Sequence, residues 1–242
     1  MVTVMVPAFN EEAYIRNTVE SLIQSAKKHN VDLDVIIIND GSTDRTQDII
    51  TELVTEHAFI RCISHGKNLG IGVSLKSALK VGVGDKFLIV GGDGDLSEDG
   101  ISTLFKHMNQ AEITSIYYLN KEKRSRFRNI LSIVYDLMYV LFFNIHIQYI
   151  NAACVYPMDK LKQLDLKSTR FAIVAEVTVK LLRTGCTYHE YPSFMERGTD
   201  GSSAVKLKNF WEVCVSFVRL IFDMLIVNRE KYNHKPVRMY LK

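Results

Sequence analysis

Short apolar runs alternate with amphipathic segments over residues 2–119, and this alternation constrains the fold more than any other feature. The runs "VTVMVP", "DVIIIND", "FIRCIS", "KFLIV" and "ITSIYYL" predict strands at 2–7, 34–40, 59–64, 86–90 and 113–119. The segments between them predict helices at 10–28, 44–56, 70–83 and 98–110, the first capped by Asn10. Strands that alternate with helices predict an α/β fold with a mostly parallel sheet covered on both faces.

The second half is less regular. An apolar helix is expected over 130–147, a strand and a short helix within 150–164, a helix at 173–184 and a strand within 187–197. A long amphipathic helix is expected over 207–228. Residues 206–242 contain eight Lys or Arg and three acids, whereas the whole chain has a net charge of +3. We therefore expect one compact domain over residues 1–204, followed by an amphipathic helix and a basic tail over 205–242.

Several common functions of such a sheet are excluded by missing motifs. The first strand is followed by "PAFNEE" and not by GxGxxG, which argues against a dinucleotide-binding Rossmann domain. The chain contains neither a GxxxxGK[ST] phosphate loop nor a GxSxG nucleophile elbow. An EF-hand starting at Asp93 would need glycine and glutamate where Glu98 and Leu104 stand.

The remaining composition favours a cytosolic protein without a membrane span. The four cysteines are far apart and form no CxxC pair, so reduced thiols are expected. The first residues resemble a strand more than a secretion signal. No run of about 18 apolar residues occurs, because Asp136, Arg219 and Asp223 interrupt the two longest apolar segments.

Asp93 and Asp95 stand one residue apart in the glycine-rich stretch "VGGDGDLS", directly after a predicted strand. Parallel sheets bind ligands outside the carboxyl ends of their strands. Two carboxylates on such a loop can hold one Mg²⁺ or Mn²⁺ ion, which also binds substrate phosphates. A solvated turn is the alternative for a single pair of this kind, and other motifs have to decide.

Four motifs occur in order: "VPAFNEE" (6–12), "NDGSTD" (39–44), "KNLGIG" (67–72) and "GDGDLS" (92–97). Together they closely resemble glycosyltransferase family 2, whose members have the GT-A fold, a Rossmann-like sheet flanked by helices. The resemblance continues more weakly over 171–203. The nearest subgroup is that of the dolichyl- and polyprenyl-phosphate sugar synthases.

The resemblance implies a role for each motif. The nucleotide of a sugar donor would be bound by Pro7, Ala8, Asn10, Glu12, Asp40, Gly41, Asn68 and Gly70. Asp93 would lie near the ribose and bind the metal ion. Asp95 would be the main metal ligand and a catalytic residue. Helix capping and turn formation remain alternatives for Asn10 and Asp40, and a plain loop for residues 68–70.

The family reaction is an inverting transfer of a sugar from a UDP- or GDP-sugar in one displacement. An alcohol acceptor would need a general base, for which Glu176 is the candidate, with a surface glutamate as the alternative. A phosphate acceptor would need no base. Arg197, with Lys206 nearby, would bind the diphosphate or an acceptor phosphate. Asn151 stands where the subgroup has aspartate, and Ala204 where it has lysine, which leaves the acceptor open.

A lipid phosphate acceptor is favoured by two segments. "KEKRSRFR" (121–128) precedes an apolar helix, and the last helix carries Phe210, Trp211, Phe217 and Phe222 before the basic tail. This pattern is typical of binding to an anionic membrane surface, here the cytoplasmic face. Both helices could instead pack on the sheet or form a homodimer contact.

Other functions remain open. The chain could transfer sugar to a soluble or glycan acceptor, or bind a nucleotide sugar without catalysis. A metal-dependent nucleotidyltransferase would also use two acids, but it normally has a basic glycine-rich loop after its first strand. Nucleic acid is not expected as a partner, because the acidic strand-end edge would repel phosphates.

Overall fold

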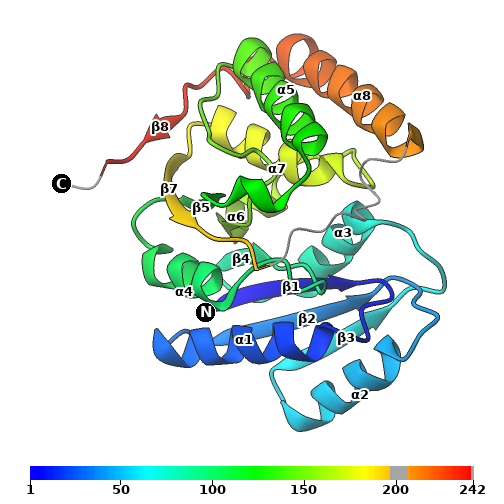
Figure 1. Cartoon of the computed structure of the whole chain (residues 1–242). Helices are drawn as coiled ribbons and strands as arrows, with labels where there is room; N and C mark the ends of the chain where they lie inside the picture. The colour runs from blue at the N-terminus through cyan, green and yellow to red at the C-terminus, as the bar shows by residue number, and fades with distance from the viewer. Residues whose placement is uncertain (197–206, 241–242) are drawn as a thin grey trace.

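The structure is a computed structural model that describes residues 1–196 and 207–240, with only the backbone for 207–210. Its centre is an eight-stranded sheet in the order β3-β2-β1-β4-β6-β5-β7-β8 (Figure 1). The strands are β1 (Val2–Ala8), β2 (Leu33–Asn39), β3 (Ile60–Ser64), β4 (Lys86–Ile89), β5 (Ile113–Tyr118), β6 (Cys154–Pro157), β7 (Thr187–Ser193) and β8 (Val237–Arg238).

Helices cover both faces of the sheet, as predicted. One face is packed against α1 (Ile15–Lys28), α2 (Thr46–Glu56) and α4 (Glu98–His107), which contribute to one apolar core. The other face is packed against α3 (Ile71–Val81), α5 (Arg126–Phe143), α6 (Met158–Lys162), α7 (Ala172–Arg183) and α8 (Leu207–Phe222), which contribute to a second core (Figure 1). The central strands β1 and β2 are buried on both faces, which explains their continuous apolar runs.

The sheet is mostly parallel, as expected. Strands β1 to β4 pair in parallel, and so do β5, β7 and β8. β6 runs antiparallel to both of its neighbours, β4 and β5. Because β6 is reversed, the residues before it lie at the same edge as the carboxyl ends of β4 and β5.

Several predicted boundaries were wrong. The first helix begins at Ile15 and its N-cap residue is Tyr14, so Asn10 does not cap it. Asn10 has a φ of 59° and lies in the preceding loop. The expected last helix is divided into α8 and a π-helical turn, η3 (Asp223–Val227). The short strand β8 was not predicted, because two residues leave no periodicity to detect.

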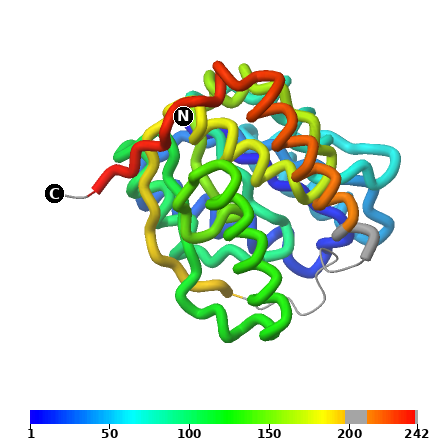
Figure 2. The backbone as a smooth tube through the Cα atoms, turned by 90° about the horizontal axis from the view of Figure 1, so that it is seen from above, coloured from blue at the N-terminus to red at the C-terminus, as the bar shows by residue number. Residues whose placement is uncertain are grey.

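The C-terminal helix packs on the rest of the chain. Phe217 of α8 contacts the rings of Tyr139 and Phe143 in α5, with centroids 5.1 and 5.9 Å apart. Leu220 and Met224 belong to the same core as α7. Figure 2 looks down on this side of the molecule, with α5 in green and α8 in orange. The predicted domain boundary at 204–205 lies outside the described residues and stays a prediction.

Candidate active site

The loops after β1 and β2 hold each other at the carboxyl edge of the sheet. The side-chain oxygen of Asn10 accepts a hydrogen bond from the backbone amide of Thr43 at 2.8 Å. The backbone amide of Asn10 donates to Ser42 Oγ at 3.0 Å. Oε2 of Glu12 accepts from the Arg45 amide at 2.9 Å. Two residues expected at the nucleotide pocket therefore fix the loop geometry there.

Asp40 connects the β2 end to the loop before α3. Its carboxylate accepts from the amides of Leu69 and Gly70 at 3.0 and 2.8 Å, and it lies 2.7 Å from Nδ1 of His65. Asp40 is buried, so these partners replace water around its charge. The structure thus brings together Asp40 and Gly70, which the motifs had placed in one pocket.

Two of the predicted glycines allow backbones to approach closely. Gly41 has a φ of +78°, and a Cβ there would lie 2.5 Å from the carbonyl carbon of Lys67 and 2.8 Å from the Asn68 nitrogen. Gly70 has a φ of +93°, and a Cβ there would lie 2.8 Å from the Thr169 carbonyl oxygen. Any larger residue at either position would separate these loops.

Asp93 and Asp95 line one cavity at the strand-end edge. Its wall consists of Ile89, Gly91, Asp93, Asp95, Leu96, Tyr118, Asn151, Ala152, Ala153, Cys154, Tyr156 and Val174. Oδ1 of Asp93 accepts from the Asp95 amide at 3.2 Å, and Gly94 between them has a φ of +69°. The reversed strand β6 explains why Asn151, distant in sequence, faces this loop. Oδ1 of Asn151 is buried and has no hydrogen-bond partner among the described residues.

Arg124 lies beside the Asp95 carboxylate. Nη2 of Arg124 is 3.8 Å from Oδ2 of Asp95, and the Arg124 side chain is 9% exposed. The guanidinium carbon is 5.5 Å from the ring centroids of both Tyr118 and Tyr149. Burial and the nearby Tyr149 hydroxyl and Asp95 carboxylate raise the pKa of Tyr118 well above its usual value. Tyr118 therefore stays neutral beside the guanidinium.

Arg124 corrects one element of the sequence interpretation, which assigned it to a cluster of membrane-facing cations. It lies six residues after the end of β5, at the same edge as the loop Asp93-Gly94-Asp95 (the DGD loop). That position after a strand end was the available signal. Among the other cations of the cluster, Lys123 donates to the carbonyls of Met195 and Glu196, whereas Arg126 is exposed.

The residues of the cavity fit a divalent cation bound together with a phosphate substrate. No group of three or more His, Cys, Asp or Glu side chains that could hold a metal occurs in the described part of the chain. Mg²⁺ is usually bound by one or two carboxylates, with substrate phosphates and water completing its shell. Asp93 and Asp95 supply two hard oxygen ligands in one cavity, which matches this donor set.

Glu176 is buried, so the alternative of a surface glutamate was wrong. Its carboxylate accepts from the amides of Lys167 and Ser168 at 2.9 and 2.8 Å and from Nζ of Lys180 at 2.8 Å. Burial alone would raise the pKa of Glu176, but these partners lower it overall. The wall of the Asp95 cavity, where it is described, does not include Glu176. Its role as a base remains a prediction.

The other site residues have different outcomes. Pro7 and Ala8 end β1, and the Pro7 carbonyl accepts from the amide of Gly92 at 3.1 Å. This bond joins the β1 end to the DGD loop. Arg197 and Lys206 lie outside the described residues, and their predicted phosphate contacts stay predictions.

Comparison with known proteins identifies the family. The model of Glycosyl transferase family 2 matches residues 3–163. Dolichyl-phosphate beta-glucosyltransferase ALG5D of Trichomonas vaginalis is 28% identical over 156 residues, which are 58% of this chain and 48% of that protein. Probable glycosyltransferase YdaM of Bacillus subtilis is 33% identical over 119 residues, 49% of this chain and 25% of YdaM. The chain thus matches about half or less of the length of these curated relatives.

Solved structures share the fold. Glucosyl-3-phosphoglycerate synthase from Mycobacterium tuberculosis, in complex with Mg²⁺ and uridine diphosphate, has a TM-score of 0.65 at 16% identity, covering 92% of this chain and 78% of that one. TarS of S. aureus with UDP-GlcNAc has a TM-score of 0.60 at 19% identity, covering 92% and 66%. The expected GT-A fold is confirmed. On the match over residues 3–163, the chain belongs to glycosyltransferase family 2.

Proposed function

We propose that the chain transfers a sugar from a nucleoside diphosphate sugar to a polyprenyl phosphate at a membrane surface, with inversion at the anomeric carbon. The observation that carries the proposal is the meeting of Asp93, Asp95 and Asn151 in one cavity at the strand-end edge of a family 2 fold. UDP is the favoured nucleotide, because the similar solved structures are complexes with UDP-GlcNAc or UDP. GDP remains the alternative donor nucleotide.

The cavity residues would act on the leaving diphosphate. Asp93 and Asp95 would hold a Mg²⁺ or Mn²⁺ ion, which offsets negative charge on the diphosphate when bound. Arg124, packed beside the rings of Tyr118 and Tyr149, would add a second positive charge near Asp95. The unpartnered Oδ1 of Asn151 is available to accept a hydrogen bond from a sugar hydroxyl.

A phosphate acceptor agrees better with Glu176 than a hydroxyl acceptor does. A phosphate monoester has a second pKa near 6 and is mostly dianionic at pH 7, so it needs no base. Glu176 has a lowered pKa, and two of its three partners are amides of the loop at Lys167 and Ser168, while the third is the buried Lys180. We propose that Glu176 is a positioning residue for this loop. Relatives named dolichyl-phosphate beta-glucosyltransferase support the same acceptor class.

The outer helices would bind the membrane. α5, α8 and η3 expose large apolar side chains: Phe127, Ile130, Ile133, Val134, Leu137, Leu141, Phe142, Trp211, Val215, Val218, Phe222, Ile226 and Val227. Burying one such side chain fully is worth about 1.5–3 kcal/mol. The two helices are in contact through Phe142 and Phe217, with ring centroids 5.6 Å apart, so their apolar faces adjoin.

The way of binding is proposed to be peripheral, on the cytoplasmic face. Among the described residues, none of the helices combines the length and apolar character needed to cross a bilayer. Exposed cations beside the apolar faces, among them Lys121, Arg126 and Arg229, would each add about 1 kcal/mol on an anionic surface.

A donor and acceptor screen tests the proposed function. UDP- and GDP-sugars would be incubated with Mn²⁺ and either a polyprenyl phosphate or soluble glycans, and the products identified by mass spectrometry. A glycosylated polyprenyl phosphate is expected. Transfer only to a glycan would favour the soluble-acceptor alternative. Nucleotide-sugar binding without any product would favour a non-catalytic binding protein. A dimer mass in sedimentation without lipid would favour the alternative in which the exposed faces of α5 and α8 form a homodimer contact.

A further inference from the structure

A second cavity lies between α8 and the segment before α7. It has a volume of about 400 Å³ and is lined by Lys167, Ser168, Thr169, Arg170, Trp211, Glu212, Val215, Ser216 and Arg219. None of these residues lines the Asp93–Asp95 cavity. Neither the family motifs nor the proposed transfer reaction assigns a function to it.

The lining is cationic. Lys167, Arg170 and Arg219 oppose a single carboxylate, Glu212, so the lining side chains have a net charge of +2. Burial raises the pKa of Glu212, which favours its neutral form, although Arg170 opposes this. Lys167 also pairs with Asp165 at 2.6 Å, in a contact that is about half exposed on both sides. Exposed pairs of this kind contribute little and exchange readily for other anions.

The cavity opens beside an apolar surface. Trp211 and Val215 line it, and with Val218 and Phe222 they form the exposed stripe of α8. Trp211 is 72% exposed. Tryptophan favours the membrane interface, where an apolar body and a polar N–H are both accommodated. A ligand that joins an anionic group to apolar chains is therefore complementary to the cavity and its border.

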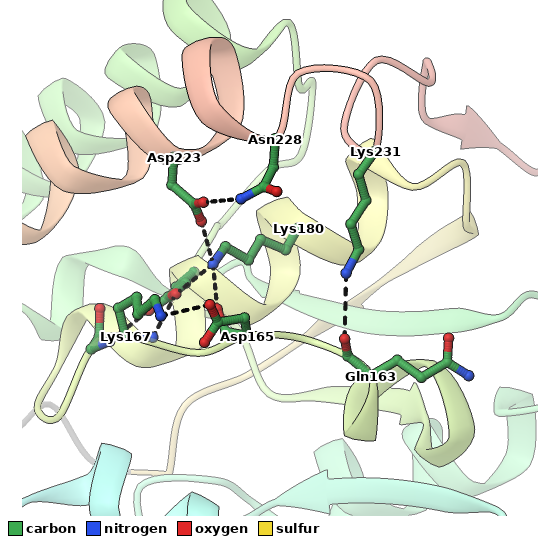
Figure 3. Close-up of polar contacts among 9 residues, drawn as sticks. Gln163, Asp165, Lys167, Lys180, Asp223, Asn228 and Lys231 are labelled. Carbon is green, nitrogen blue, oxygen red and sulfur yellow. Dashed lines mark hydrogen bonds and ion pairs between the residues drawn. The ribbon is translucent and has the colours of Figure 1, made fainter.

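Buried bonds hold both walls of the cavity. Glu176 accepts from the amides of Lys167 and Ser168, and Lys180 pairs with Glu176 at 2.8 Å. Lys180 also pairs with Asp223 at 2.7 Å, just after α8 (Figure 3). Its amine donates to the Asp165 carbonyl at 2.6 Å. The loop wall and the helix wall are thus linked through one buried ammonium group, and a preformed site costs less to organise on binding.

We propose that this cavity binds the phosphate headgroup of an anionic membrane lipid. Lys167, Arg170 and Arg219 would donate charge-assisted hydrogen bonds to the phosphate, with Trp211 at the level of the headgroups. The site would orient the enzyme on the bilayer, and it shares no lining residue with the Asp93–Asp95 cavity. The inference rests on the membrane binding in the proposed function, and not on the transfer reaction.

Trp211 provides the readout, because it is the only tryptophan of the chain. Its emission would be followed, together with vesicle sedimentation, on phosphatidylcholine vesicles with and without phosphatidylglycerol. The test variant is K167Q/R170Q/R219Q. The control variant, K121Q/R126Q/R229Q, removes the same charge from exposed cations outside the cavity.

Wild type is expected to bind phosphatidylglycerol vesicles with a blue shift of Trp211 emission. At physiological salt the test variant should bind at least about tenfold more weakly than the control variant, because its three cations line one cavity and can contact a single phosphate together. R219Q alone, a substitution on an exposed helix position, should show the same direction of change if the triple variant fails to fold. R219K should retain binding.

Three results would overturn the proposal. Equal loss in the test and control variants would mean that the cavity is not the headgroup site, while membrane binding would stand. A wild-type protein that binds neither kind of vesicle would overturn both this inference and the membrane part of the proposed function. A Trp211 response to inorganic phosphate alone, without vesicle binding, would assign the cavity to a soluble anion.

Discussion

Arg124 and Asp95 face each other in the candidate active site, with Nη2 of Arg124 3.8 Å from Oδ2 of Asp95. The guanidinium lies beside the adjoining rings of Tyr118 and Tyr149, at 5.5 Å from each centroid, so its position is set by packing and not by the aspartate alone. A fixed cation therefore stands next to the proposed metal ligand before any substrate binds.

Asp95→Asn is expected to lower turnover by at least about 100-fold, the usual effect of removing one key electrostatic stabiliser. The neutral amide is a poor ligand for a hard cation. EDTA should inactivate the parent protein to a similar degree, and added Mn²⁺ should restore it. Turnover measured with the screened donor checks this, and full activity in EDTA would disprove the metal role.

Arg124→Gln is expected to lower kcat/KM by roughly 10- to 100-fold, because hydrogen bonds to charged groups contribute about 1.5–3 kcal/mol. Arg126→Gln, which removes an exposed cation two residues away, is the matched control. Both variants would be assayed for hydrolysis or binding of the soluble sugar donor. Steady-state kinetics of both variants decide the question. Equal effects of the two substitutions on kcat/KM would show that Arg124 has no specific role in the active site.

Asp40→Ala should weaken nucleotide binding measured by calorimetry. The substitution leaves the buried amides of Leu69 and Gly70 without their acceptor, at a cost of about 1–3 kcal/mol in stability. Asp48→Ala, at an exposed position of α2, is the control. Unchanged nucleotide affinity in Asp40→Ala would show that this loop does not shape the nucleotide pocket.

Lys180→Met is expected to reduce the free energy of unfolding by about 3–5 kcal/mol, because it leaves the buried Glu176 and the partly buried Asp223 without their cation. Adding Glu176→Gln should recover part of the loss, which urea denaturation would measure. Since the pKa of Glu176 is lowered by folding, its contribution is present above the unfolded value near 4.5 and is lost as the pH falls below it. If the losses in the free energy of unfolding from Lys180→Met and Glu176→Gln were fully additive, the two side chains would not be energetically coupled.

Asp136 gives a pH-dependent prediction. Burial raises the pKa of Asp136 from 3.8 to about 6, so its neutral form is favoured in the folded chain. Its stability contribution is complete below 3.8 and is lost as the pH rises through 6. Asp136→Asn, which can still accept from the Ile150 amide, should therefore stabilise the protein at pH 8 by on the order of 1–3 kcal/mol and have little effect near pH 4. Thermal melts at both pH values test this.

Much of the architecture could be predicted from local patterns. Continuous apolar runs at Val35–Ile38 and the helical segments between the strands predict a sheet covered on both faces, because burial on two faces leaves no polar alternation. Helix ends were less certain. The Asn10 side chain serves the Thr43 amide of the next loop instead of its own helix, a choice that depends on residues far along the chain.

The sequence by itself determined the α/β class, because short-range periodicity encodes it. It predicted the strand-end edge as the site, with Asp93 and Asp95 as its acids, through the resemblance of four motifs to family 2. Only the tertiary structure decided that Arg124 turns toward Asp95, that Asn151 enters the same cavity through the reversed strand β6, and that Glu176 is buried with Lys180. The residue type alone does not reveal whether a lysine or arginine lies on the surface or in the core. Its place is decided by which carboxylates and rings the fold brings within reach, since a charge enters the interior only where partners replace its water.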